Sequence, residues 1–452
     1  MVFTEAHSGS SVCTPTRYGI LTGRYAWRTR LQAGVLMGES PHLITPDRLT
    51  VAKLLREHGY STACLGKWHL GMDWTQLPAP KKTRKKGGTW NIDYTKPVVN
   101  GPTAVGFDYY FGVAASLDMP PFTFIENDRV VKIPTVEKKW VRTGPAAEDF
   151  DAIDTLPTLG ARAVDYIAKH ADASKHGTPF FLYLPLTSPH TPLVPSKEWQ
   201  GKNLLGPYGD FVMESDEVAG KVLKSIDDAG IADNTLVIFT SDNGCAPYIG
   251  VKEMEEKGHF ASADRRGYKA DIWDGGHHVP FIARWPGKVA AGSSNNTLTC
   301  LTDLLATCAE ITGAKLPDNA GEDSVSILSG LLARADAPKH EAVVHHSIQG
   351  KFAIRQGNWK LELCPGSGGW SSPKDGEAVK QGLPPVQLYE MSGDVAEAKN
   401  VQTGNVEIVT RLTKLLEKYV ADGRSTPGAP QKNDVEVDIW KKKPKLQEAE
   451  KE

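Results

Sequence analysis

Apolar residues along the chain follow two alternating spacings. Some stretches have apolar positions three or four residues apart, which is typical of helices with one buried face. These predicted helices span residues 50–58, 158–170 and 208–229. Short continuous apolar runs lie between them and predict strands buried on both faces. These predicted strands span residues 60–65, 180–186 and 236–240. The alternation indicates an α/β fold with a large mixed, mainly parallel sheet flanked by helices.

The pattern changes near residue 342. Short predicted strands there are separated by glycine turns, which favours a small antiparallel sheet. These strands span residues 342–346, 352–355 and 359–363. A predicted helix over 406–419 follows, and the sequence after Gly423 is rich in Pro, Lys and Glu, as in a draped or poorly ordered tail. We therefore expect a large α/β domain over 1–340, a small antiparallel α+β domain over 341–422 and a polar charged tail over 423–452.

The bulk composition limits the class of protein and partner. The chain has 452 residues, 40% apolar and 23% charged, with a formal net charge of −2 at pH 7. This charge gives no reason to expect nucleic acid or an anionic membrane as a partner. No apolar run approaches the roughly 18 residues that cross a bilayer. Residues 1–7 have neither the basic start nor the apolar stretch of a signal peptide, and six scattered Cys residues do not indicate a compartment.

The first candidate for chemistry is Cys13. Pro15 suits the first turn of a helix and Gly23 suits its end, so we expect a helix with Cys13 near its N-terminus. Backbone N–H groups at that end favour an anion. Arg17 follows one turn later, where its planar guanidinium can hold an oxyanion or a carboxylate. The Cys-x-Pro-x-Arg spacing alone is a weak indication, because an ordinary buried Cys at a helix start has the same pattern.

Further segments place cations and imidazoles on constrained backbone. Lys67 and His69 alternate across Trp68, so on an extended segment both point to the same side. A cation and an imidazole together suit an oxyanion and a proton relay. His190 lies between two prolines after a predicted strand, which presents it from a stiff loop. A structural or solvated loop is the alternative reading of both segments.

Asp242 and Asn243 are candidate metal ligands. They follow the predicted strand over 236–240, and ligands collect beyond the carboxyl ends of strands in such sheets. A carboxylate and an amide oxygen are hard donors that suit Ca²⁺ or Mg²⁺ rather than zinc. An Asp-Asn-Gly turn by itself is usually only a turn. The interpretation of this pair as metal ligands therefore depends on the sequence around it.

Taken together, these segments resemble the type I, formylglycine-dependent sulfatases of the alkaline phosphatase superfamily. The resemblance covers about residues 1–405, and its strongest segments are 3–25, 66–71, 188–192, 236–244 and 266–281. It implies an alkaline phosphatase-like α/β catalytic domain over 1–340 and a small antiparallel C-terminal domain. It also implies an arylsulfatase-like enzyme that hydrolyses sulfate monoesters of a sulfated small molecule or saccharide to an alcohol and inorganic sulfate.

The resemblance implies a modified nucleophile. In the family a maturation enzyme oxidises the Cys that corresponds to Cys13 to formylglycine. The hydrated aldehyde carries two hydroxyls on one carbon, so one can attack sulfur and the other, once deprotonated, can expel sulfate and restore the aldehyde. By resemblance, the residues that bind sulfate or assist catalysis are Arg17, Lys67, His69, His190 and Lys269, with Ser116 as a more loosely aligned contact. The residues that would hold a divalent metal, Ca²⁺ or alternatively Mg²⁺, are Asp242, Asn243 and the modified Cys13.

The chain departs from the family pattern in three places. Asp274 stands where the family commonly has Glu. His277 and His278 stand where a pair that is not His is more common, so we interpret them as supporting or substrate-facing residues rather than metal ligands. The family also carries, before the Cys, a strand that ends in a metal-binding Asp-Asp pair, which residues 1–12 do not show. We therefore expect an N-terminally truncated catalytic domain, with a periplasmic or secreted location if a signal peptide lies upstream.

Two alternatives to a sulfatase remain open at this point. One is a phosphate or phosphonate ester hydrolase of the same superfamily, against which the complete segment around Cys13 argues. The other is an inactive chain with only a binding or scaffold role. A basic run over 81–86 is most simply a solvated loop, and the alternative is that it attracts an anionic sulfated polymer.

Overall fold

The computed structural model describes residues 1–78, 91–334 and 338–441, and the basic run over 81–86 lies outside them. The chain divides into two compact units, each described here by itself. The first unit combines Met1–Val35 with Leu236–Glu452, and the second is Leu36–Thr235. The domain boundaries expected near residues 340 and 422 remain predictions. Among the helices that the structure describes, none has the length and apolar character to cross a bilayer.

The second unit is built on a five-stranded sheet in the order β6-β5-β4-β3-β9. Its strands are β3 (Ser61–Lys67), β4 (Tyr109–Val113), β5 (Ile125–Glu126), β6 (Arg129–Val130) and β9 (Phe180–Tyr183). Strand β3 pairs in parallel with both β4 and β9, whereas β4–β5 and β5–β6 are antiparallel. The strands β7 (Val136–Trp140) and β8 (Arg142–Ala146) form a separate antiparallel pair. The parallel centre of this sheet agrees with the expected α/β class.

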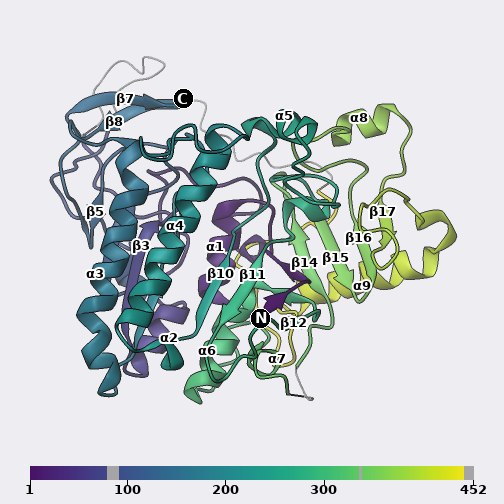
Figure 1. Cartoon of the computed structure of the whole chain (residues 1–452). Coiled ribbons are helices and arrows are strands. Elements are labelled where there is room, and N and C mark those ends of the chain that lie inside the picture. Colours follow the sequence, from purple (N-terminus) through teal and green to yellow (C-terminus); the bar gives the residue numbers. More distant parts are fainter. Residues whose placement is uncertain (79–90, 335–337, 442–452) are drawn as a thin grey trace. The chain divides into compact units, whose positions relative to one another are not determined.

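Helices of the second unit cover this sheet. They are α2 (Val51–Glu57), α3 (Thr155–Lys175) and α4 (Pro207–Asp228). The long helices α3 and α4 lie side by side in Figure 1, with Val218 of α4 against Gly160 of α3. Leu159 and Ala163 of α3 share a core cluster with Leu65 of β3. Helix α3 starts earlier than the predicted 158–170, because Pro157 falls in its first turn, where no N–H is needed.

The first unit contains several smaller sheets. One has the order β10-β11-β1-β12, with β10 (Val237–Thr240), β11 (Phe281–Arg284), β1 (Val2–Phe3) and β12 (Ser294–Asn295). A parallel pair joins β2 (Ala6–His7) to β13 (Thr299–Cys300). The third sheet is an antiparallel series of β14 (Val343–His346), β15 (Phe352–Gln356), β16 (Trp359–Glu362) and β17 (Gln387–Glu390). The small antiparallel sheet expected after residue 342 is therefore present.

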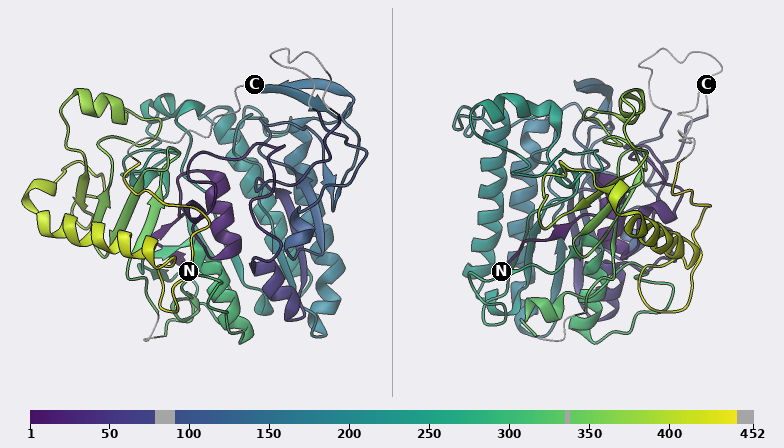
Figure 2. Two further views of the ribbon diagram at one scale, coloured as in Figure 1. Left: turned by 180° about the vertical axis from the view of Figure 1, so that it is seen from behind. Right: turned by 90° about the vertical axis from the view of Figure 1, so that its right-hand side faces the viewer.

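The helices of the first unit are α1 (Cys13–Thr22), α5 (Val251–Glu256), α6 (Leu304–Thr312), α7 (Leu328–Leu331), α8 (Asp375–Lys380) and α9 (Val406–Ala421). Figure 2 shows α9 beside the β14–β17 sheet. Leu412 and Leu416 of α9 are fully buried in one cluster with Ile354 and Leu361 of the sheet. The tail returns to the body of this unit, where Asp434 binds Arg24 at 3.1 Å. The described part of the tail is therefore packed rather than loose.

Candidate active site

The buried helix α1 begins at Cys13. Pro15 lies in its first turn, and Gly23, at a φ of 62°, ends it in the left-handed conformation that glycine favours. Cys13 is only 3% exposed, and every residue of the helix is buried. The expected placement of Cys13 at a helix N-terminus is confirmed. Position 13 is thus held rigidly where backbone N–H groups attract negative charge.

Arg17 fixes the first candidate metal ligand. Its Nε and Nη2 atoms both donate to Oδ2 of Asp242, at 2.8 and 2.7 Å. Asp242 follows β10, which ends at Thr240, and Arg17 is 5% exposed. Two charge-assisted hydrogen bonds from a planar guanidinium hold this carboxylate in one orientation. The structure therefore brings Arg17 and Asp242 together, one helical turn from Cys13.

Asn243 offers an oxygen suited to a cation. Its Nδ2 donates to the carbonyl of Gly244 at 2.9 Å, which directs the amide. Its Oδ1 is buried and accepts no hydrogen bond from the residues that the structure describes. A buried acceptor without a donor is costly unless a cation or water satisfies it. With the adjacent carboxylate, this oxygen fits a hard divalent metal such as Ca²⁺ or Mg²⁺.

Lys269 lies between the segments of Cys13 and Asp242. Its backbone N–H donates to the carbonyl of Cys245 at 2.8 Å, and the N–H of Ala270 donates to Ser11 at 2.9 Å. Lys269 is 4% exposed. The first unit therefore gathers Cys13, Arg17, Asp242, Asn243 and Lys269 in one region. These residues come from three segments of the sequence that only the fold brings together.

The other predicted residues belong to the second unit, and Lys67 is the last residue of β3. Its N–H donates to the carbonyl of Pro185 at 2.8 Å. Gly66, at a φ of 137°, approaches the same carbonyl so closely that a Cβ would lie 2.1 Å from its oxygen. Only glycine fits there. Gly66 thus allows β3 to pass close to the carbonyl of Pro185 and to end at Lys67.

His69 does not continue the strand. It has a φ of 58°, in the left-handed region, so the extended segment predicted for Lys67 and His69 does not reach His69. Its N–H donates to the carbonyl of Ala114 at 2.9 Å, and its Nε2 donates to Leu36 at 2.7 Å. The first bond fixes the backbone, and the second fixes the ring and its tautomer, with the lone pair of the neutral ring on Nδ1. A left-handed non-glycine residue held this firmly is common at functional sites.

His190 lies close to an acidic residue that the sequence analysis missed. Its Nδ1 donates to the carbonyl of Thr191 at 2.7 Å and lies 3.9 Å from Oδ1 of Asp118. Arg142 holds the other oxygen of Asp118. Within the described residues, the buried Oγ of Ser116 has no hydrogen-bond partner. The only sequence signal for Asp118 was an acidic residue inside the mostly apolar run 113–122.

His277 is fully buried, and its ring packs among other histidines. It contacts His7 and His345. Asp274, at the position where the family commonly has Glu, binds Lys360 at 3.2 Å. These residues form a separate buried cluster within the first unit.

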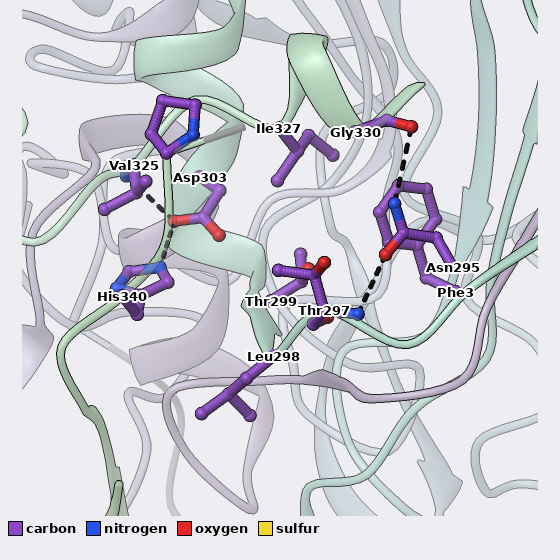
Figure 3. A pocket seen from close by; sticks show the side chains of 11 residues that line it. Phe3, Asn295, Thr297, Leu298, Thr299, Asp303, Val325, Ile327, Gly330 and His340 are labelled. Atoms are coloured by element: carbon purple, nitrogen blue, oxygen red, sulfur yellow. Dashed lines mark hydrogen bonds and ion pairs between the residues drawn. The ribbon is translucent and has the colours of Figure 1, made fainter. Parts of the chain in front are cut away.

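A small cavity in the first unit lies apart from these residues. It is lined by Phe3, Leu298 and Ile327 among others, and the Asp303–His340 pair at 2.7 Å borders it (Figure 3). Its volume of about 10 Å³ is the lower limit for a single water molecule. It therefore has no room for a substrate.

Comparisons with known proteins identify the family of this chain. The sulfatase family model matches residues 1–314. The chain is 31% identical to an N-acetylgalactosamine-6-O-sulfatase of Bacteroides thetaiotaomicron, over 92% of this chain and 85% of that protein. It is 30% identical to human arylsulfatase A, over 95% and 82%. A solved structure from work on glycosaminoglycan metabolism by B. thetaiotaomicron superposes with a TM-score of 0.79 at 29% identity, covering 92% of this chain and 91% of that one.

Proposed function

This chain belongs to the sulfatase family and is a sulfate-ester hydrolase of the formylglycine type that uses a divalent metal, and on that premise we propose that Cys13 becomes the nucleophile and that the substrate is a sulfated saccharide. The observation that carries the proposal is the pairing of Arg17 with Asp242 one turn from Cys13. It places a fixed cation and a fixed carboxylate beside the first residue of a buried helix. A maturation enzyme is the partner that would modify Cys13.

We propose Ca²⁺ as the metal, held by Asp242, Asn243 and an oxygen at position 13. The buried Oδ1 of Asn243 supports this, since it is a hard donor that no described residue satisfies. When bound, such an ion withdraws negative charge from the sulfate oxygens. Arg17, through its two hydrogen bonds, would hold the Asp242 carboxylate in place as a ligand for such an ion.

The remaining residues are assigned by their chemistry and their family positions. Lys67 and Lys269 bind the sulfate oxygens as cations, and Ser116 adds a hydroxyl contact. His69, whose tautomer leaves the lone pair on Nδ1, accepts the proton of the attacking hydroxyl. His190 donates a proton to the leaving alcohol oxygen as its bond to sulfur breaks. The products are the free saccharide hydroxyl and inorganic sulfate.

The choice of a saccharide rests on the named relatives, one of which is an N-acetylgalactosamine-6-O-sulfatase. We expect purified, matured protein to release sulfate from an N-acetylgalactosamine 6-sulfate saccharide with a higher kcat/KM than from an aryl sulfate. Phosphate and phosphonate esters should react roughly 100-fold more slowly or worse. Ion chromatography of released sulfate and phosphate in parallel reactions measures this. Preference for the phosphorus esters would reject the sulfatase assignment, and preference for the aryl ester would reject the saccharide.

Asp118 is expected to position His190 for proton donation. Its carboxylate attracts the ring when the ring carries the proton for the leaving oxygen. Asp118→Asn should therefore lower kcat roughly 10- to 100-fold for an alkyl or sugar sulfate, whose leaving group needs the proton. An aryl sulfate with an acidic phenol should be affected much less. Steady-state kinetics on the two substrates measures the difference.

The matched control is Asp149→Asn, which removes an exposed carboxylate paired with Lys132. It should leave both substrates unaffected. An equal loss on the two substrates in Asp118→Asn would mean that Asp118 only supports the local fold.

A further inference from the structure

We propose that His7, His277 and His345 form a second metal site, which takes a borderline transition-metal ion of the zinc type. All three side chains are completely buried in the first unit. One ring nitrogen from each lies within 4.8 Å of the others. The site is separate in chemistry from the proposed calcium site, because imidazole nitrogens select zinc and its neighbours over Ca²⁺ or Mg²⁺.

The spacing of the nitrogens is close to that of a zinc site. Two nitrogens bound tetrahedrally at the usual zinc distance are about 3.4 Å apart. Nδ1 of His7 and Nδ1 of His277 are 3.2 Å apart and share a hydrogen bond, whose proton a bound ion would displace. The rings of His277 and His345 lie parallel, with centroids 3.8 Å apart. Because a metal lies in the plane of each ring that binds it, one of these two rings turns when the ion enters.

The outer nitrogens of two rings have the partners that metal-bound histidines usually have. Nε2 of His277 donates to the carbonyl of Ile272 at 3.1 Å, and Nδ1 of His345 donates to the carbonyl of Ser8 at 2.9 Å. A hydrogen bond of this kind fixes the tautomer and leaves the other nitrogen as the ligand. The remaining nitrogen of His345, Nε2, is buried and has no hydrogen-bond partner anywhere in the described chain. This buried acceptor is the observation that points most directly to a metal.

His7 needs one local adjustment. Its Nε2 now accepts from Nη1 of Arg355 at 3.1 Å, and Glu5 lies 4.0 Å from the same nitrogen. Arg355 and Glu5 are themselves paired at 2.6 Å. When Nδ1 of His7 binds the metal, its Nε2 becomes a donor, and the Glu5 carboxylate is the acceptor within reach.

Burial keeps the three rings neutral. Burial lowers the pKa of His7 and His277 well below the ordinary value, and that of His345 to about 3. Neutral imidazole is the form that binds metals. The carboxyl groups around the cluster are Glu5, Asp274, Glu362 and Glu397, and the cations among them are Arg265, Arg266, Arg355 and Lys360.

The three ligands come from distant parts of the sequence. His7 ends β2, His277 follows the turn after Asp274, and His345 lies in β14. One ion would therefore link the segment that leads into Cys13 to the C-terminal sheet. Its expected role is to stabilise the first unit, not to take part in sulfate hydrolysis.

The test uses the full chain, stripped of metal and dialysed against Zn²⁺ in the presence of excess Mg²⁺, which occupies the oxygen site. We expect one zinc per chain by elemental analysis and a rise in Tm on zinc addition. Cobalt substitution should give the intense visible absorption of a low-symmetry nitrogen site. His345→Gln and His277→Gln should each lose the ion and the rise in Tm.

Two controls define the outcome. His346→Gln alters the buried neighbouring histidine of the same strand, and Asp242→Asn alters the proposed calcium site. Both should retain the zinc. If the two cluster variants fail to fold, X-ray absorption of the zinc-loaded wild type tests the proposal instead. The spectrum should show three imidazole ligands, and any other ligand set would contradict the site. No tight zinc in the wild type, or equal zinc in all variants, would overturn the proposal without touching the sulfatase assignment.

Discussion

Replacing Cys13 with alanine is expected to reduce sulfate-ester hydrolysis by roughly 10⁴-fold or more in kcat. Alanine cannot be oxidised to formylglycine, so both the attacking hydroxyl and the second hydroxyl that expels sulfate are lost. The fold should persist, because alanine is a good helix former and Cys13 lies at the start of α1. Release of sulfate from the saccharide substrate measures the loss.

The matched control is Cys308→Ala, another buried cysteine, which lies in α6. It should keep nearly full activity. Mass spectrometry of the peptide that contains residue 13 should show the aldehyde in the wild type and in Cys308→Ala. Substantial activity in Cys13→Ala, or a wild-type enzyme that is active with an unmodified thiol, would contradict the proposed nucleophile.

Much of the fold could be predicted from the sequence because its signals are local. The helix expected over 208–229 is α4 (Pro207–Asp228), and the one over 406–419 is α9 (Val406–Ala421). Both have a strongly amphipathic pattern. The strand expected over 180–186 ends at Tyr183, because Pro185 cannot donate to a neighbouring strand. The α/β class and the small antiparallel sheet are confirmed.

The site was predictable only where residues sit within short motifs. Cys13 and Arg17 share one helix, so their relation follows from the helical repeat. The left-handed backbone of His69 could not be predicted, since it depends on contacts with Leu36 and Ala114 far along the chain. Asp118 was missed for the same reason.

The cluster of His7, His277 and His345 could not be predicted from the sequence. From the sequence alone, His277 is interpreted as a supporting or substrate-facing residue rather than a metal ligand. Its partners His7 and His345 are separated from it by 270 and 68 residues, and nothing local predicts that the three rings meet. Only the fold of the first unit brings them together.

Lys360 is the residue whose loss should most destabilise the folded protein. Its Nζ is completely buried and binds Glu397 at 2.6 Å, with Asp274 and Glu362 each at 3.2 Å. Burial alone would lower the pKa of Lys360, but these carboxylates raise it, so the side chain is charged throughout the working pH range. Lys360→Met leaves three buried acids without their cation and should lower the free energy of unfolding by about 3–5 kcal/mol.

The pH dependence of the lower free energy of unfolding in Lys360→Met distinguishes a lost buried cation from a simple packing defect. Burial raises the pKa of Glu397 well above its ordinary value, and removing Lys360 raises it further. A carboxyl whose folded-state pKa exceeds its unfolded-state pKa binds more protons when the protein is folded. The stability of the variant therefore falls as the pH rises from the unfolded-state pKa of Glu397 to its folded-state pKa. The deficit relative to wild type should therefore be smaller near about pH 5 than near about pH 8.

Urea unfolding followed by tryptophan fluorescence at the two pH values measures the deficit. The control is Lys418→Met, which removes an exposed lysine paired with Asp422 on α9 and should cost less than about 1 kcal/mol at either pH. A deficit in Lys360→Met that is no larger than in this control, or that grows as the pH falls, would show that the buried acids do not depend on Lys360. A deficit that is larger than in the control and grows as the pH rises would identify Lys360 as the residue that stabilises Asp274, Glu362 and Glu397 inside the first unit.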